Sequence, residues 1–70
     1  MNNTEKFLEQ LALHPNSSLK DLTQHTGMNA KQTASASCNV LRRGLVTRER
    51  RPDPEYPNIG VWYYTLKPTL

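Results

Sequence analysis

The chain has 70 residues, and a folded domain of this size buries only about 60% of the surface that its unfolded chain exposes. We therefore expect a single domain over residues 1–70. We do not expect an enzyme, since a deep pocket behind a full core needs a longer chain. The one cysteine excludes an intramolecular disulfide and a zinc site built from cysteines. Because only two histidines accompany it, we expect no metal and no cofactor.

The net charge of +3 is unevenly distributed along the chain. Residues 31–51 hold six basic residues and one acidic residue, a net charge of +5, whereas the flanking segments are slightly acidic. A basic block of this kind is typical of a surface that binds a polyanion. It also suits an ordinary solvated face, so charge alone leaves both interpretations open.

Neither a membrane span nor a signal peptide is predicted. The sequence has no run of about 20 apolar residues, and no long apolar stretch follows its first residues. We therefore expect a cytoplasmic location and no membrane partner.

The first predicted helix begins near Thr4, which can act as its N-cap, and stops at His14, because Pro15 disfavours helical backbone there. His14 itself is expected at the surface, as is His25. The apolar stripe of this helix is expected to consist of Phe7, Leu8, Leu11 and Ala12.

A turn and a cap are predicted at residues 16–18, followed by a short second helix. Ser18 and Asp21 have the spacing of a capping box, and Gly27 is suited to end the helix in left-handed backbone. Met28 is expected to fill the tight turn that follows.

The third predicted helix spans about residues 30–43. Asn29 is its expected N-cap with Gln32 as the capping-box partner, and Gly44 ends it. Cys38 is interpreted as a small buried hydrophobe. The inward positions are expected to be Ala30, Ala34, Cys38 and Leu41, with Ser37 and Val40 alongside. The outward positions are expected to be Lys31, Gln32, Ser35, Ala36, Asn39 and Arg42.

Two strands separated by a proline-rich loop are predicted after the third helix. The first begins at residues 45–48, three prolines within residues 52–57 form a stiff loop, and residues 61–66 form the second strand. Side chains alternate along a strand, so Trp62, Tyr64 and Leu66 share one face, and Trp62 is expected in the core. Tyr56 is expected to be exposed in the loop.

The predicted fold class is α+β, with three helices followed by a two-stranded antiparallel hairpin. Two short helices around a turn that holds Gly27 have the helix-turn-helix layout, whose second helix enters the DNA major groove. Residues 19–66 resemble a winged helix-turn-helix domain, on the segments LKDL, TGM and NVLRRGLVTR (residues 39–48). The last segment is similar to the junction between recognition helix and wing in multiple-antibiotic-resistance-type repressors and in small bacterial and phage regulators.

The resemblance implies a set of DNA-binding residues. It places Asn29, Lys31, Gln32, Ser35 and Asn39 at or near the major groove. It places Arg48, Arg50 and Arg51 on the wing side, over the DNA backbone or minor groove, and Arg42 and Arg43 within reach of phosphate. Asparagine and glutamine can each make paired hydrogen bonds to adenine. All of these residues also suit a solvated face, and strand alternation predicts that only one or two of the wing arginines touch phosphate.

The main hypothesis is a regulator of transcription that binds double-stranded DNA, acts as a homodimer or with a protein partner, and has the size of a phage or plasmid regulator. The alternative is a winged helix that binds another protein and no DNA. In that case the acidic wing tip, with Asp53 and Glu55, and the exposed aromatic residues would form the interface.

Overall fold

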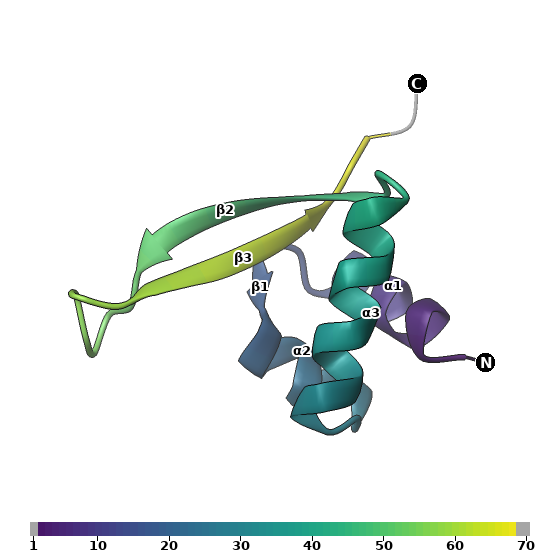
Figure 1. The fold of residues 1–70 in the computed structure, drawn as a ribbon, viewed down its shortest axis with the longest axis horizontal. Helices are drawn as coiled ribbons and strands as arrows, with labels where there is room; N and C mark the ends of the chain where they lie inside the picture. The colour runs from purple at the N-terminus through teal and green to yellow at the C-terminus, as the bar shows by residue number, and fades with distance from the viewer. Residues whose placement is uncertain (1, 69–70) are drawn as a thin grey trace.

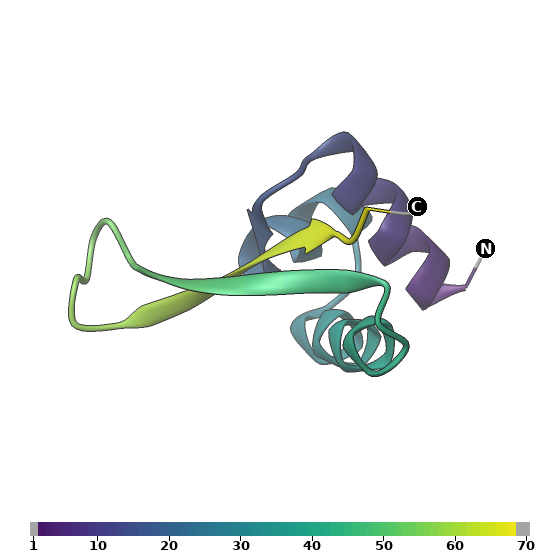
Figure 2. The same ribbon diagram turned by 90° about the horizontal axis from the view of Figure 1, so that it is seen from above.

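The computed structural model describes residues 2–68, and in it three helices gather at one end while a long hairpin extends beyond them (Figures 1 and 2). Within this described part, no helix is both long enough and apolar enough to cross a membrane. The elements in chain order are α1 (Asn3–Leu13), β1 (Ser17–Ser18), α2 (Leu19–Thr26), α3 (Ala30–Arg42), β2 (Val46–Pro52) and β3 (Gly60–Leu66).

The N-cap of α1 is Asn2, so the prediction of Thr4 as the cap was wrong. The side-chain Oδ1 of Asn2 accepts a hydrogen bond from the backbone N–H of Glu5 at 2.8 Å. Asparagine is at least as good an N-cap as threonine, which allows the helix to begin two residues earlier. The C-cap is His14, as Pro15 predicted.

Both later helices begin with the capping boxes that the sequence predicted. In α2 the backbone N–H of Asp21 donates to Ser18 Oγ at 3.2 Å, and the N–H of Ser18 donates to Asp21 Oδ2 at 3.3 Å. Asn29 and Gln32 make the equivalent pair at the start of α3. Gly27 ends α2 with a φ of 75°, a left-handed conformation that favours glycine. These local signals fix the positions of the helix-turn-helix elements.

The sheet has three antiparallel strands in the order β1-β3-β2, so the predicted two-stranded hairpin carries an additional strand. β2 and β3 pair along their full lengths. β1 is only Ser17–Ser18, and its partners are Tyr64 and Tyr63. The sequence indicated only a turn and a cap at this point, because two residues are too few to show alternation.

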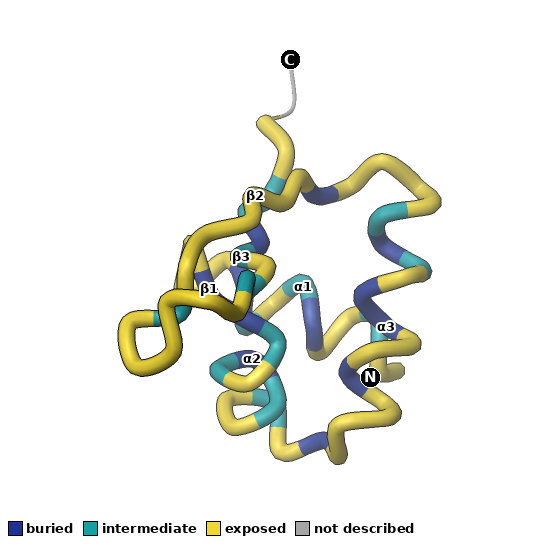
Figure 3. Tube along the Cα trace, turned by 60° about the vertical axis from the view of Figure 1, so that its left-hand side comes forward, coloured by how far each residue is buried: buried dark blue, intermediate teal, exposed yellow. Residues whose placement is uncertain are grey.

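The core lies where the inner faces of the helices meet one face of the sheet (Figure 3). Phe7 and Tyr64 are wholly buried, and their rings meet edge to face with centroids 5.8 Å apart. Ala12 is exposed, although the sequence placed it in the apolar stripe of α1. The buried apolar side chains are Phe7, Leu11, Leu22, Met28, Ala36, Val40, Val46 and Tyr64.

α3 turns a different face toward the core from the one predicted. Ala30, Ala34 and Cys38 were expected to face inward, but all three are exposed, and Leu41 is only half-buried. Ala36 was expected to face outward and is buried. The buried residues of the helix are Thr33, Ala36, Ser37 and Val40.

Two hydroxyl groups explain this difference. Thr33 Oγ1 donates to the backbone oxygen of Asn29 at 3.0 Å and lies 3.0 Å from Thr23 Oγ1. Ser37 Oγ donates to the backbone oxygen of Ala34 at 2.7 Å. Because these hydroxyls find partners inside the fold, both residues can be buried without losing a hydrogen bond. Apolar periodicity alone therefore predicts the wrong face of α3 for the core.

Candidate nucleic-acid interface

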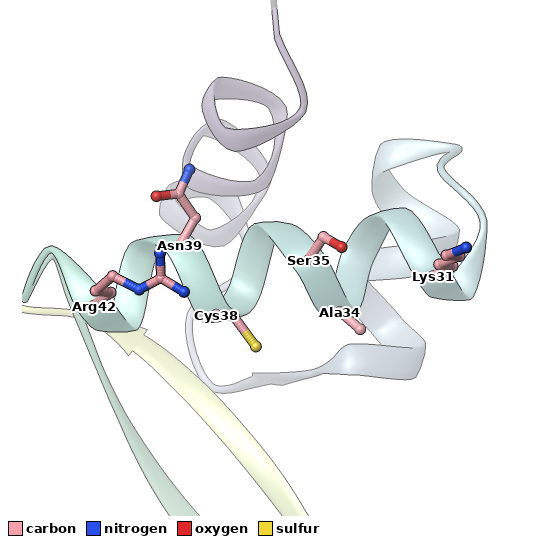
Figure 4. Close-up of a pocket in the computed structure, with 6 residues that line it drawn as sticks. All are labelled: Lys31, Ala34, Ser35, Cys38, Asn39 and Arg42. Atoms are coloured by element: carbon pink, nitrogen blue, oxygen red, sulfur yellow. The ribbon is translucent and has the colours of Figure 1, made fainter.

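The exposed face of α3 forms a shallow hollow, and the side chains in its middle are small (Figure 4). Ala34 and Cys38 lie in its middle, and their small side chains leave the helix backbone close to the surface. The ends carry basic groups, since Lys31 lies in the first turn and Arg42 in the last. The residues that line the hollow are Lys31, Ala34, Ser35, Cys38, Asn39 and Arg42.

Cys38 was predicted to be buried, but its thiol is exposed on this face. The reason is the rotation of α3 described above, which buries Thr33 and Ser37 instead. The sequence did contain a signal for this arrangement. Thr33, Ser37 and Val40 recur at helical spacing, and threonine or serine can bond back to its own helix.

Asn29 and Gln32 lie at the exposed N-terminus of α3, but their side chains are already engaged with the backbone. Asn29 Oδ1 accepts from the N–H of Gln32 at 2.8 Å, and Gln32 Oε1 accepts from the N–H of Asn29 at 3.1 Å. A paired contact to adenine uses both the oxygen and the nitrogen of a side-chain amide. Such a contact would therefore compete with the capping box, whereas the amide NH₂ groups are not used by it.

Asn39 lies on the side of α3 that borders α1 (Figure 4). Its Nδ2 donates a hydrogen bond to Thr4 Oγ1 at 2.9 Å. Asn39 is half-buried, unlike Lys31 and Ser35, which are exposed. The structure therefore brings Asn39 to the edge of the hollow and gives its amide a role in joining two helices.

Arg42 and Arg43 lie at the C-terminal end of α3. Arg42 is the last helical residue and Arg43 is the C-cap, and both side chains are exposed. Positive charge at this end is favoured by the helix dipole. Only Arg42 of the two lines the hollow with Lys31, so Arg43 stands apart from that group.

The three arginines of β2 do not share one face of the hairpin. Side chains directly opposite each other on paired antiparallel strands lie on the same face. Arg50 is opposite Trp62 and Arg51 is opposite Val61, so Arg50 and Arg51 lie on different faces. Arg48 is on the face of Arg50, as strand alternation predicts.

The two faces also differ in how their charges are paired. Arg51 Nη2 makes a salt bridge of 2.9 Å with Glu49 Oε2. On the other face, Arg48 and Arg50 lie near Trp62, with their Cζ atoms 4.1 Å and 6.0 Å from the centroid of its ring. The structure therefore gathers Arg48 and Arg50 at Trp62, whereas Arg51 lies over Tyr63 on the other face, with its Cζ 5.3 Å from that ring centroid.

Trp62 was predicted to lie in the core, but 37% of its surface is exposed. The prediction of its strand face was correct, since Tyr64 on the same face is wholly buried. The hairpin extends beyond the helices (Figure 1), and Trp62 lies nearer its tip than Tyr64 does, so Trp62 is less completely covered. The sequence does not show how far a strand extends past the core.

The wing tip, the loop between β2 and β3, is held by Asp53, one of its two acidic residues. Asp53 Oδ1 accepts from the backbone N–H of Glu55 at 2.8 Å, and the N–H of Asp53 donates to the oxygen of Ile59 at 2.9 Å. Aspartate commonly stabilises turns in this way. Tyr56 is 60% exposed, as predicted, and Ile59 is exposed as well.

No protein-family model and no curated protein matches the chain, but solved structures do. A MarR family transcription regulator is 29% identical, with a TM-score of 0.75, over 94% of this chain and 41% of its own length. Stf76 from the Sulfolobus islandicus plasmid-virus pSSVx is 19% identical, with a TM-score of 0.79, over 99% of this chain and 86% of its own. The PcaV transcriptional regulator from Streptomyces coelicolor, solved with its natural ligand, is 18% identical, with a TM-score of 0.77, over 96% and 45%.

These similarities confirm the predicted fold class. The chain spans less than half the length of the MarR family regulator and of PcaV, and most of the length of Stf76. This chain has three helices and an antiparallel sheet whose hairpin extends as a wing. The chain therefore has the α+β winged helix-turn-helix fold, and it resembles MarR family regulators and a small viral protein.

Proposed function

We propose that the protein binds double-stranded DNA and regulates transcription, with α3 in the major groove and the wing on the DNA backbone. The observation that carries this proposal is the exposed face of α3. It has small side chains in the middle and basic groups at both ends, and it occupies the second helix of the helix-turn-helix. The similarity to transcription regulators supports the same function.

The geometry favours a division of roles along this face. Lys31, Arg42 and Arg43 are long, exposed and basic, which suits phosphate contacts that fix the position of the helix. Ser35 is exposed beside the small side chains of the hollow, so its hydroxyl is available to a base edge. Asn29, Gln32 and Asn39 contribute fewer free groups, because each already makes a hydrogen bond within the fold.

A single copy offers one helix and one wing, which is a small contact surface for specific DNA binding. Proteins of the helix-turn-helix class usually bind as dimers to two half-sites about one helical turn apart. We therefore include a homodimer or a protein partner in the proposal. Specific binding of a single copy to one half-site, with no second copy or partner on the DNA, would contradict this part of the proposal.

The test of the proposal is fluorescence anisotropy with a labelled random duplex at about 50 and 200 mM salt. We expect binding that weakens steeply with salt, because each neutralised phosphate adds about 0.9 to the logarithmic slope. Lys31→Gln should reduce the slope by about one. Lys6→Gln removes the same charge from an exposed position on α1 and is the matched control, which should leave the slope unchanged.

A second candidate function is a protein-binding wing, and the exposed wing tip favours it. Tyr56 and Ile59 are 60% and 56% exposed next to Glu55, and a wing that follows phosphates is usually basic. No duplex binding at the lower salt would support this candidate and contradict the DNA-binding proposal. A partner captured through the wing would then stay bound in excess DNA and would be lost on Tyr56→Ala.

A further inference from the structure

The helix-facing side of the wing carries a cluster of two arginines around one tryptophan, which we call the Trp62 cluster: Arg48, Arg50 and Trp62. The Cζ atom of Arg48 lies 4.1 Å from the ring centroid, a distance typical of a guanidinium over an aromatic face. Arg50 is directly opposite Trp62 in the strand register, and its Cζ lies 6.0 Å from the same centroid. Two cationic side chains are thus held beside one ring.

A glycine in β3 makes room for the second arginine. A Cβ atom placed on Gly60 would lie 2.7 Å from Arg50 Cζ and 2.9 Å from its Cδ, well inside van der Waals contact. The Arg50 side chain therefore lies across β3 in space that any other residue at position 60 would occupy. The three atoms nearest to that Cβ position all belong to Arg50, so the space at Gly60 and the position of the Arg50 side chain are linked.

The charges of the cluster are available to an anion. Within residues 2–68, the carboxylate of Glu49 pairs with Arg51 on the opposite face, and neither Arg48 nor Arg50 makes a salt bridge. Stacking on an aromatic ring uses the flat face of a guanidinium and leaves its N–H edge free to donate. Phosphate oxygens accept from that edge in paired hydrogen bonds.

We propose that Arg48 and Arg50 form a preformed clamp for a DNA phosphate, and that Trp62 and Gly60 are positioning residues that hold the two guanidiniums in place. This inference rests on the proposed function, and it assigns the wing contacts to one face of the hairpin. Arg51 lies outside the clamp, because its guanidinium is paired with Glu49 on the other face. The clamp binds the backbone and does not read the base sequence.

Removing the charges one at a time tests which arginines contact phosphate. The assay is anisotropy with the random duplex between about 50 and 200 mM salt. Arg48→Gln and Arg50→Gln should each lower the logarithmic salt slope by about one. Arg51→Gln removes the same charge from the same strand and should leave the slope nearly unchanged. Equal effects of all three substitutions would overturn the clamp.

Changing the supports without changing the charge tests the positioning role. Trp62→Leu and Gly60→Ala keep both arginines, so the salt slope should stay as it is in the unsubstituted protein. The affinity should fall roughly two- to tenfold, since long side chains must then be ordered during binding. Trp62→Tyr retains an aromatic face and should restore most of the affinity. Unchanged affinity in both Trp62→Leu and Gly60→Ala would overturn the positioning role.

Two readouts separate a failure of this inference from other causes. Thermal melting by circular dichroism shows whether a variant is folded at the assay temperature, and Gly60→Ala provides a second variant if Trp62→Leu unfolds. If the unsubstituted protein does not bind duplex at all, the proposed function and the clamp both fail. If it binds steeply with salt while Arg48→Gln and Arg50→Gln match Arg51→Gln, the clamp alone fails.

Discussion

Asn39 in α3 is tied to Thr4 in α1, across 35 positions of the chain, by a hydrogen bond of 2.9 Å from its Nδ2 to the threonine Oγ1. The bond is part-buried and joins the expected recognition helix to the first helix. Asn39 therefore helps to fix the angle at which α3 is presented. The same side chain was predicted from the sequence to read a base, and the two roles make different demands on its amide.

We predict that Asn39→Ala lowers the free energy of unfolding by about 1 kcal/mol, the usual net value of one hydrogen bond. Urea denaturation measures this change. Thr4→Ala should have a similar effect, and the double variant should lose much less than the sum of the two, because they remove the same bond. Additive losses would show that the bond contributes nothing. If the DNA base preference changes in Asn39→Ala but not in Thr4→Ala, the prediction that Asn39 reads a base is supported.

A second prediction concerns the face of α3 that packs in the core. Ala36→Lys should lower the free energy of unfolding by about 3 kcal/mol or more, because it buries an unpaired charge at a position that is 4% exposed. Ala34→Lys is the matched control. It introduces the same side chain two positions away on the exposed face, where the change should stay within about 0.5 kcal/mol.

Thermal or urea unfolding of the two variants checks this prediction. Equal losses would mean that α3 does not present the face described here. The sequence interpretation, with Ala34 inward and Ala36 outward, predicts the reverse order. The pair of substitutions thus distinguishes the two orientations of the helix directly.

The parts of the fold that local chemistry determines were predicted from the sequence. The capping boxes of α2 and α3 and the left-handed turn at Gly27 depend on residues three or fewer positions apart. The face of α3 was not predicted, because Thr33 and Ser37 are polar and become suitable for the core only when their hydroxyls find partners. A prediction from apolar residues alone does not take these hydrogen bonds into account.

The features of the fold that were not predicted from the sequence depend on distances between elements. Trp62 and Tyr64 share a strand face, yet Tyr64 is buried and Trp62 is partly exposed, and the sequence does not show how far the strand extends past the helices. β1 exists because Ser17–Ser18 lie beside β3, a pairing between segments 45 or more positions apart. The basic candidate site residues come from the sequence alone, and their role in DNA binding stays a prediction. The sequence could not show that Arg51 is paired while Arg48 and Arg50 adjoin Trp62.

A third prediction uses Cys38 as a probe of the proposed DNA-binding face. Its thiol is exposed in the middle of the α3 hollow, so it should react with a maleimide in the folded protein. Bound duplex DNA should slow this reaction at least several-fold, because a helix in the major groove has its exposed face covered. Mass spectrometry of the labelled protein with and without duplex measures the protection.

The control for this experiment is a thiol placed away from the proposed face. Leu13→Cys in a Cys38→Ser background puts a reactive group at the end of α1, where Leu13 is 65% exposed. Duplex DNA should leave the rate of labelling at position 13 unchanged. Equal protection at both positions would indicate a nonspecific effect of DNA, and no protection at Cys38 would contradict the placement of α3 in the groove.

The last prediction concerns the turn that sets the angle between α2 and α3. Gly27 has a φ of 75°, and nothing lies within 4 Å of where a Cβ would be, so a side chain there is limited by the backbone and not by space. Gly27→Ala should therefore lower the free energy of unfolding by about 1 kcal/mol, while Gly27→Asn should lose less, since asparagine tolerates left-handed backbone better. Urea denaturation measures both variants. Equal losses for alanine and asparagine would show that the cost does not arise from the left-handed conformation, and a loss well above about 2 kcal/mol would point to a steric contact at the turn.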